Sequence, residues 1–301
     1  MLTKIHHLYP NSIIIRHQST ELFSENYVWF REPNEDIWLG IPVQDIHDKE
    51  LSILKSLLPY HESIPMNNKG SRSWYQFLFK NGELPPVSND IRYRVLHFHL
   101  NGKDLNTDDI ESAIKGFFPD DIIIIWESEF RLYIVERERK HPLDEEGLYS
   151  LCKTFETDLF INAFIYCGRF TFLTKEYPEN FRKERTFFHY ALELSPQNRV
   201  FSFEKIFPRI LTAHMAEELS NGLFSSIGEV FKDDPDLFIS IKVLLENNLN
   251  VSVTSKKLYV HRNTLQYRID KFTDKTGINL KDFNSAVTVY FACLAMEIIP
   301  S

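Results

Sequence analysis

The sequence of 301 residues is poor in cysteine and glycine, and each shortage excludes a class of protein. Its three cysteines, Cys152, Cys167 and Cys293, lie far apart and form no Cys-x-x-Cys pair. This spacing argues against a disulfide framework and fits a reducing compartment. With only 10 glycines, the chain has no glycine-rich loop of the kind that binds nucleotide phosphates.

Long apolar runs are missing as well. The least polar long stretch, Ser285 to Met296, holds 12 residues without a charge, whereas a membrane helix needs about 20. The N-terminus has no apolar segment followed by a small-residue cleavage site. These absences predict a soluble cytoplasmic protein without a membrane partner.

The overall charge limits the kinds of partner. Hydrophobic residues make up 43% of the chain and charged residues 25%, which is ordinary for a globular protein. The length exceeds that of one typical domain, and 25 Phe and 13 Tyr provide material for large cores. A net charge of −8 argues against a protein that coats nucleic acid over its whole surface. It leaves room for one small basic segment on an acidic body.

Periodicity along the chain predicts an α+β fold. Residues 1–90 form an N-terminal mixed region of unassigned role, with two strands around a polar turn at residues 33–36 and a loop at "NNKGSRS". Residues 91–200 follow the order βαββαβ plus a helix, which predicts one antiparallel sheet covered by helices, one of them capped by Thr107. Residues 201–232 are expected to be a helical linker and residues 233–301 an all-α domain.

The stretch "LYVHRNTLQYRIDKF" joins two predicted helices within the last domain. The first should run from about Val251 to Leu258 after an N-cap at Asn250 or Ser252. The second should run from about Arg262 to Thr273, and the chain should leave the helix at Gly277. A short helix, a tight turn and a second helix are the parts of a helix-turn-helix. Tyr259 stands where many such turns carry glycine, and a left-handed backbone there would cost about 1–2 kcal/mol.

The two faces of the second helix differ in chemistry. Leu265, Ile269 and Phe272 recur at the spacing of a buried stripe. Arg262, Asn263, Gln266 and Tyr267 cannot share that stripe, so they should face outward near the helix N-terminus. In helix-turn-helix proteins this end meets base edges, where Arg recognises guanine and Asn or Gln recognises adenine.

Local charge favours the same interpretation. Residues 251–277 contain six basic and two acidic residues, which gives +4 and leaves −12 on the remaining chain. A local positive patch of this kind suits phosphate binding. The open alternative is a helical hairpin whose basic face is merely solvated.

The last 65 or so residues resemble the C-terminal helix-turn-helix of the PucR/CdaR family of bacterial transcriptional regulators. The resemblance rests on "VHRNTLQYRI" followed by "TGINL", with Ser255 where the family usually has alanine. The βαββαβ region and "YPENFRKERTFFHYAL" are similar to the degenerate GGDEF-like domain of many members. The resemblance implies a regulator with an N-terminal mixed domain, a GGDEF-like antiparallel-sheet domain and an all-α DNA-binding domain.

The motif and the helix geometry together give the expected DNA-binding residues. Arg262, Asn263 and Gln266 should read bases, while Thr264 and Tyr267 should touch the DNA backbone or thymine methyl groups. Lys256, Lys257 and Arg268 are expected mainly to bind phosphates. His261 is included because it belongs to the matched motif. The full set is Lys256, Lys257, His261, Arg262, Asn263, Thr264, Gln266, Tyr267 and Arg268.

Enzyme activity and cofactors are not expected. The hairpin "WESEF" has Glu127 and Ser128 where an active diguanylate cyclase has glycines that admit the nucleotide, which predicts a solvated, inactive turn. His97 and His99 share a strand face without a visible third ligand, so no metal site is expected.

The expected partners are duplex DNA, a second copy of the chain and a small-molecule effector of unassigned identity. A dimer is expected because one short recognition helix contacts few bases, whereas two copies reach two half-sites. The competing function is a catalytically inactive GGDEF-like ligand-binding or scaffold protein whose C-terminal helices serve only in assembly.

Overall fold

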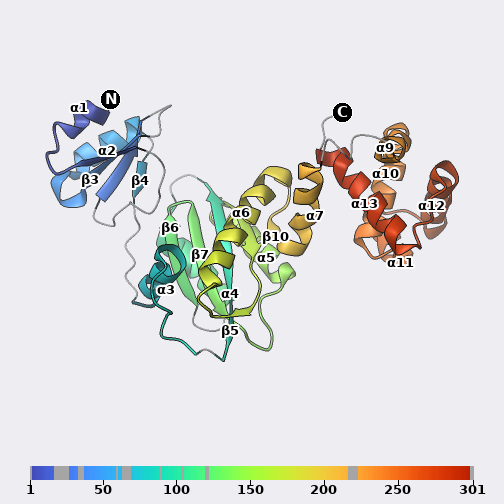
Figure 1. The fold of residues 1–301 in the computed structure, drawn as a ribbon, viewed down its shortest axis with the longest axis horizontal. Helices are drawn as coiled ribbons and strands as arrows, with labels where there is room; N and C mark the ends of the chain where they lie inside the picture. Colours follow the sequence, from blue (N-terminus) through green and yellow to red (C-terminus); the bar gives the residue numbers. More distant parts are fainter. Residues whose placement is uncertain are drawn as a thin grey trace. The chain divides into compact units, whose positions relative to one another are not determined.

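The computed structural model describes residues 2–16, 27–32, 37–58, 60–62, 69–88, 90–102, 105–118, 122–215 and 223–298. They fall into two compact units (Figure 1). The first extends to Ala191 and includes Ser195–Phe203, and the second comprises Leu192–Leu194 and the residues from Glu204 onward. The α+β class expected from the sequence is confirmed.

A four-stranded antiparallel sheet forms the N-terminal part of the first unit. Its strand order is β1-β3-β2-β4, and its core is apolar. The strands are β1 Ile13–Arg16, β2 Tyr27–Arg31, β3 Ile37–Pro42 and β4 Tyr60–Glu62, with helices α1 Leu2–His6 and α2 Asp48–Leu57 and the 3-10 turn Val43–Asp45. The two strands predicted here are thus β2 and β3, while the turn at residues 33–36 lies outside the described residues.

Gly40 on β3 is required by its cross-strand neighbour. Trp29 pairs with Gly40 and is fully buried. A Cβ atom at residue 40 would lie 2.7 Å from the Trp29 ring, closer than real atoms approach. The glycine therefore makes space for the indole on this face of the sheet.

The second sheet lies in the middle of the chain and has the strand order β10-β8-β5-β7-β6, with β9 paired to β5. Its strands are β5 Arg92–Asn101, β6 Ile123–Ser128, β7 Arg131–Arg137, β8 Asn162–Cys167, β9 Thr171–Phe172 and β10 Val200–Ser202. The accompanying helices are α3 Lys69–Lys80, α4 Thr107–Phe117, α5 Glu145–Asp158 and α6 Tyr177–Leu194. The predicted βαββαβ-helix order is confirmed.

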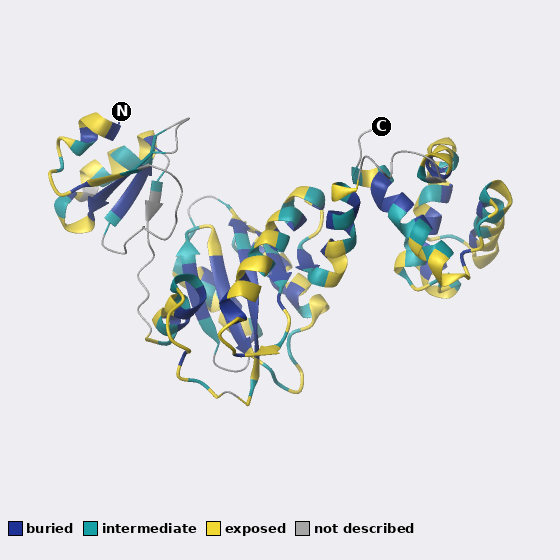
Figure 2. Ribbon diagram, viewed as in Figure 1, coloured by how far each residue is buried: buried dark blue, intermediate teal, exposed yellow. Residues whose placement is uncertain are grey.

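Successive side chains of β5 point alternately into two apolar cores, one on each face of this sheet. Leu96, Phe98 and Leu100 pack in a cluster with residues of α4 and α5. Tyr93 and Val95 point the other way and join residues of α3 and α6. The central strands β5 and β7 are accordingly buried on both faces along most of their length (Figure 2).

Three details of this region differ from the sequence-based expectation. The sheet is not wholly antiparallel, because β10 pairs with β8 in parallel. Asn106, not Thr107, caps α4, since its side chain accepts hydrogen bonds from the N–H groups of Asp108 and Asp109. The "NNKGSRS" stretch is not all loop, because α3 begins at Lys69.

Packing explains why α3 forms despite its glycine and serines. Trp74, Phe77 and Leu78 are buried together against the second sheet. Their apolar area outweighs the weak helix propensity of the first turn. Although α3 precedes residue 91, it shares its core with the middle region.

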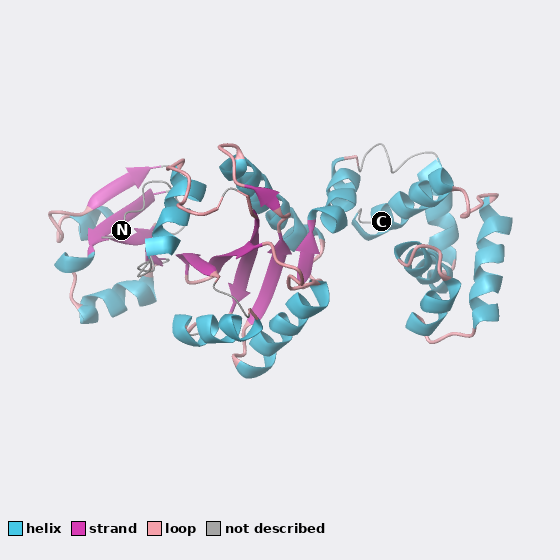
Figure 3. Ribbon diagram, turned by 90° about the horizontal axis from the view of Figure 1, so that it is seen from below, coloured by secondary structure: helices cyan, strands magenta, loops and turns pink. Residues whose placement is uncertain are grey.

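The described part of the second unit is built from helices (Figure 3). They are α7 Phe203–His214, α9 Leu223–Asp233, α10 Pro235–Glu246, α11 Val251–Lys257, α12 Arg262–Thr276 and α13 Phe283–Ile298. One apolar cluster joins α9, α10, α12 and α13 around Phe231, Leu237, Phe272 and Val289. None of the helices described has both the length and the apolar composition that a bilayer crossing requires.

Candidate nucleic-acid interface

Helix α11 begins where the sequence predicted. The Asn250 side chain accepts hydrogen bonds from the N–H groups of Ser252 and Val253, both at 3.1 Å. Two of the donors that a helix start leaves unpaired are thereby satisfied. Asn250 is therefore the N-cap, and of the two candidates named from the sequence Ser252 is not.

The turn between α11 and α12 is a Schellman motif with a tyrosine at its left-handed position. The N–H of Val260 donates to Ser255 O at 3.0 Å, and the N–H of Tyr259 donates to Lys256 O at 3.2 Å. Tyr259 has φ 53° and a side chain that is 97% exposed. Small buried Ser255 lies in the last turns of α11, so the two helices approach closely.

Helix α12 is capped at both ends. At its start the ring Nδ1 of His261 accepts a hydrogen bond from the N–H of Asn263 at 3.2 Å. At its end Gly277 adopts φ 71°, and its N–H donates to Thr273 O at 2.7 Å. Glycine takes this left-handed conformation without strain, so the expected stop at Gly277 is confirmed.

The N-terminal half of α12 presents a polar face. Leu265 and Phe272 are completely buried, and Ile269 is half-buried beside them. Figure 2 shows the exposed colouring along the remaining surface of α12. The exposed residues of this face, hereafter the polar face of α12, are Arg262, Asn263, Thr264, Gln266 and Tyr267.

Basic residues flank the polar face of α12. Lys256 and Lys257 are exposed in the last turn of α11, directly before the turn. His261 is exposed at the helix start, while its Nδ1 serves as the cap. Gln266 donates from Nε2 to Asp270 at 2.9 Å, so its amide is held along the helix surface. Eight of the nine residues expected to bind DNA are thus exposed on α11, the turn and α12.

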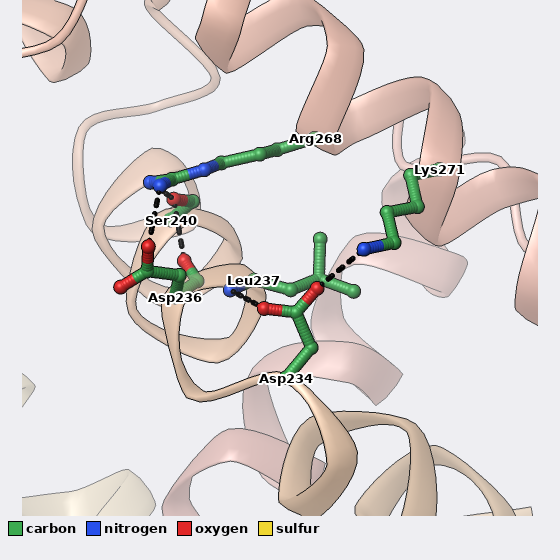
Figure 4. A network of polar contacts seen from close by, with 6 residues as sticks. All are labelled: Asp234, Asp236, Leu237, Ser240, Arg268 and Lys271. Atoms are coloured by element: carbon green, nitrogen blue, oxygen red, sulfur yellow. Dashed lines mark hydrogen bonds and ion pairs between the residues drawn. The ribbon is translucent and has the colours of Figure 1, made fainter.

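Arg268 is placed differently from the other eight. Its NH2 lies 2.7 Å from an Asp236 carboxylate oxygen, and its NH1 donates to the Ser240 hydroxyl at 2.8 Å (Figure 4). Its side chain is only 21% exposed. The guanidinium is therefore directed at α10, where the sequence had suggested contact with a phosphate.

A second ion pair lies beside the first. Lys271 Nζ lies 2.7 Å from Asp234 Oδ2, and the other oxygen of that carboxylate accepts a hydrogen bond from the N–H of Leu237 at 3.1 Å (Figure 4). Hydrogen bonds from Lys271 and from Leu237 hold the pKa of Asp234 below its ordinary value. The same hydrogen bond raises the pKa of Lys271. Asp234 thus caps α10 and binds α12 simultaneously.

The acids of α10 are functional candidates that the sequence did not reveal. Asp234 and Asp236 flank Pro235, and an acid before a proline at the first helical position is typical of a helix start. That signal locates the beginning of α10. It does not indicate a contact with α12 more than thirty residues further along the chain.

The hairpin "WESEF" is less open to solvent than expected. Arg185 NH2 of α6 lies 2.6 Å from Glu127 Oε1, and the Tyr133 hydroxyl donates to Glu127 Oε2 at 2.6 Å. Burial raises the pKa of Tyr133 well above its ordinary value, so the hydroxyl stays a donor. The prediction of a solvated turn was wrong for Glu127, whose carboxylate is bound on both oxygens.

The two histidines of β5 have different surroundings. His97 is fully buried, and its Nε2 lies 3.1 Å from Glu184 Oε2. Burial lowers the pKa of His99. Within the described ranges, no three histidine, cysteine or acidic side chains gather closely enough to hold a metal ion.

Similar proteins are known for both the whole chain and its C-terminal region. The PucR C-terminal helix-turn-helix domain matches residues 237–295. Protein YxkF of Bacillus subtilis (strain 168) is 36% identical over 294 residues, covering 96% of this chain and 97% of that protein. The purine catabolism regulatory protein of the same organism is 32% identical over 91 residues, 30% of this chain and 17% of its own length. The carbohydrate diacid regulator of Escherichia coli (strain K12) is 23% identical over 116 residues, 38% and 30% of the two chains.

The fold and the exposed helix define a helix-turn-helix regulator, in which the C-terminal helices follow an α+β region in the same chain. With these relatives, the chain belongs to the PucR/CdaR family of transcriptional regulators.

Proposed function

We propose that the chain regulates transcription by binding duplex DNA in the major groove through the polar face of α12. The observation that carries this proposal is the exposure of Arg262, Asn263 and Gln266 in the first turns of α12, while Leu265 and Phe272 are buried. These side chains lie at the helix N-terminal end, which in helix-turn-helix proteins meets the base edges. Arg262 suits guanine, whereas Asn263 and Gln266 suit adenine once Gln266 exchanges its bond to Asp270.

The neighbouring residues have supporting roles. Lys256 and Lys257 hold phosphates, because they are exposed and charged at the end of α11. His261, Thr264 and Tyr267 touch the DNA backbone or thymine methyl groups. Binding of chromosomal DNA would place the protein in the cytoplasm.

Titration of variants of the full chain tests the proposal. The DNA is the duplex that the parent chain enriches from a random-sequence pool, with an unselected duplex for comparison. Arg262→Ala should cost about 1–3 kcal/mol on the enriched duplex and relax preference at one position. Lys281→Ala removes an exposed positive charge outside the polar face of α12 and serves as the matched control.

The outcome also decides between the two functions. Circular dichroism identifies variants that remain folded. If folded Arg262→Ala and Asn263→Ala bind the enriched duplex as the parent does, the polar face of α12 does not read DNA. A parent chain that enriches no duplex would favour the scaffold function, with the C-terminal helices acting in assembly.

Two copies of the chain are proposed to bind together. One helix of this length reaches few base pairs, and a symmetric pair reaches two half-sites about one helical turn apart. The first unit would then hold the copies together or respond to a small-molecule effector. Light scattering that finds only monomers at micromolar concentration, with and without the enriched duplex, would contradict this arrangement.

The proposed function does not include cyclic dinucleotide synthesis. Glu127 stands where the resemblance to GGDEF-like domains places a permissive glycine, and Arg185 and Tyr133 bind its carboxylate. Such a carboxylate is not available to Mg²⁺ unless both contacts break. Incubation with GTP and Mg²⁺ followed by chromatography should show no product, and turnover that Glu129→Ala abolishes would contradict this.

A further inference from the structure

Two ion pairs connect α12 with the beginning of α10, and we infer that they set the orientation in which α12 meets DNA. In this inference Arg268 and Asp236 are positioning residues, and Arg268 does not bind phosphate. The inference rests on the proposed function, because it concerns the same helix. The two acids, Asp234 and Asp236, lie just before residues 237–295, which match the helix-turn-helix domain.

Arg268 is fixed by two different acceptors on α10. Its NH2 lies 2.7 Å from Asp236 Oδ2 and its NH1 lies 2.8 Å from Ser240 Oγ. Ser240 is fully buried and donates in turn to the backbone carbonyl of Asp236 at 2.7 Å. The planar guanidinium suits such a pair of acceptors, so its direction is determined as well as its distance.

Position along α12 points to the same role. Arg268 follows Leu265 by three residues and precedes Phe272 by four, so the three side chains lie along one side of the helix. Leu265 and Phe272 are completely buried. Arg268 therefore belongs to the side that faces the core, whereas Arg262 and Asn263 are exposed.

The second ion pair prevents α12 from pivoting about the first. Lys271 lies three residues after Arg268, about one turn of helix further on. It binds Asp234, which begins α10 and is held there by the N–H of Leu237. Contacts at two points, one turn apart, restrain both the rotation of α12 and its angle to α10.

Positioning and simple charge attraction predict opposite effects of removing Asp236. Loss of this carboxylate makes the region more positive, which by charge alone should strengthen binding to a polyanion. If Asp236 orients α12, its loss should instead weaken binding to the enriched duplex. The sign of the change thus separates the two roles.

The experiment compares full-chain variants on the enriched duplex and on an unselected one. Asp236→Ala should weaken binding to the enriched duplex about three- to tenfold, as expected for a partly exposed ion pair. The number of phosphates contacted stays the same, so the salt dependence should be unchanged. Asp274→Ala removes an exposed acid from α12 outside this network and should leave affinity equal or higher.

Arg268→Lys adds a test that conserves charge. A lysine can neutralise a phosphate but cannot bind Asp236 and Ser240 in the planar geometry of a guanidinium. It should therefore weaken binding as Arg268→Ala does, and the Asp236→Ala/Arg268→Ala double variant should bind no worse than either single variant. Asp236→Asn replaces Asp236→Ala in this cycle if the alanine variant fails to fold.

The outcomes separate this inference from the proposed function. A parent chain that enriches no duplex refutes both. A parent that binds, with Asp236→Ala binding as well or better, refutes the positioning role alone. Strictly additive effects in the double variant, or a salt slope that falls by about one in Arg268→Ala, also refute it by showing that Arg268 binds phosphate.

Discussion

The rings of Phe231 on α9 and Phe272 on α12 stack, with centroids 5.5 Å apart and planes inclined by 17°. Both side chains are fully buried. Phe272 belongs to the matched helix-turn-helix region, whereas Phe231 precedes it. The helix proposed to read DNA is therefore anchored by a helix outside that region, and α9 is part of the same folding unit.

Phe231→Ala should lower the free energy of unfolding of the second unit, hereafter the C-terminal unit, by about 3–5 kcal/mol, because it removes a buried ring and leaves a cavity. Phe283→Ala is the control, since Phe283 is 77% exposed and its loss should change stability by less than about 0.5 kcal/mol. Buried Cys293 reports on this unit, because burial raises the pKa of its thiol and slows labelling until the unit unfolds. Urea titration with mass-resolved labelling of Cys293 gives both values, and equal effects would contradict the anchoring role.

Lys257→Ala should weaken binding to the enriched and the unselected duplex by the same factor. A phosphate contact carries no sequence information, and its loss should reduce the slope of log affinity against log salt by about one. Affinity is measured by titration at several salt concentrations, with Lys281→Ala as the control for loss of charge. A preferential loss on the enriched duplex would assign Lys257 to base recognition.

Tyr259→Asn should stabilise the C-terminal unit by up to about 1 kcal/mol. Tyr259 has φ 53°, a region that asparagine tolerates better than tyrosine, and its exposed ring contributes little burial. Tyr259→Val should destabilise the same unit, because β-branched residues are the least tolerant of positive φ. Labelling of Cys293 in urea measures both, and a destabilised asparagine variant would show that the tyrosine ring makes a favourable contact.

Asp234→Asn should make the stability of the C-terminal unit less dependent on pH in the acid range. The native carboxylate has a lowered pKa, so its stabilising effect is complete above the unfolded value of about 3.9 and is lost as pH falls through the native value. The difference between parent and variant should therefore shrink as pH falls below about 4. Hydrogen bonds from Ser285 lower the pKa of Asp282 as well, so some acid dependence remains in the variant.

Urea midpoints measured from neutral to acid pH test this prediction. Asp274→Asn serves as the control, because Asp274 is an exposed acid on α12 outside the network. A constant difference between parent and Asp234→Asn over the whole range would contradict it.

Local signals predicted the ends of the helix-turn-helix well. Asn250 and Gly277 act on backbone groups within three or four residues, so their roles can be read from neighbouring sequence. The spacing of Leu265 and Phe272 similarly predicted the buried side of α12. The polar face of α12 followed from the same periodicity, and its contact with DNA stays a prediction.

Features that depend on distant partners were not predictable in this way. The contact of Arg268 with Asp236 joins residues that lie 32 positions apart, so local sequence did not reveal it, and the phosphate contact predicted for Arg268 from its charge stays a prediction. The parallel pairing of β10 with β8 likewise depends on residues that are remote in sequence. Helix α3 was missed because its first turn has weak helix propensity and its apolar residues gain stability only against a sheet formed later in the chain.

The left-handed tyrosine of the turn has a consequence for the divergence of related sequences. Both hydrogen bonds of the Schellman motif are present at Tyr259, although glycine is the usual residue at that position. A search pattern that demands glycine there would overlook this domain, while its backbone geometry is complete. A related protein can therefore have a residue other than glycine at this position. The left-handed backbone then lowers its folding stability by about 1–2 kcal/mol, which the burial of the flanking core residues must offset.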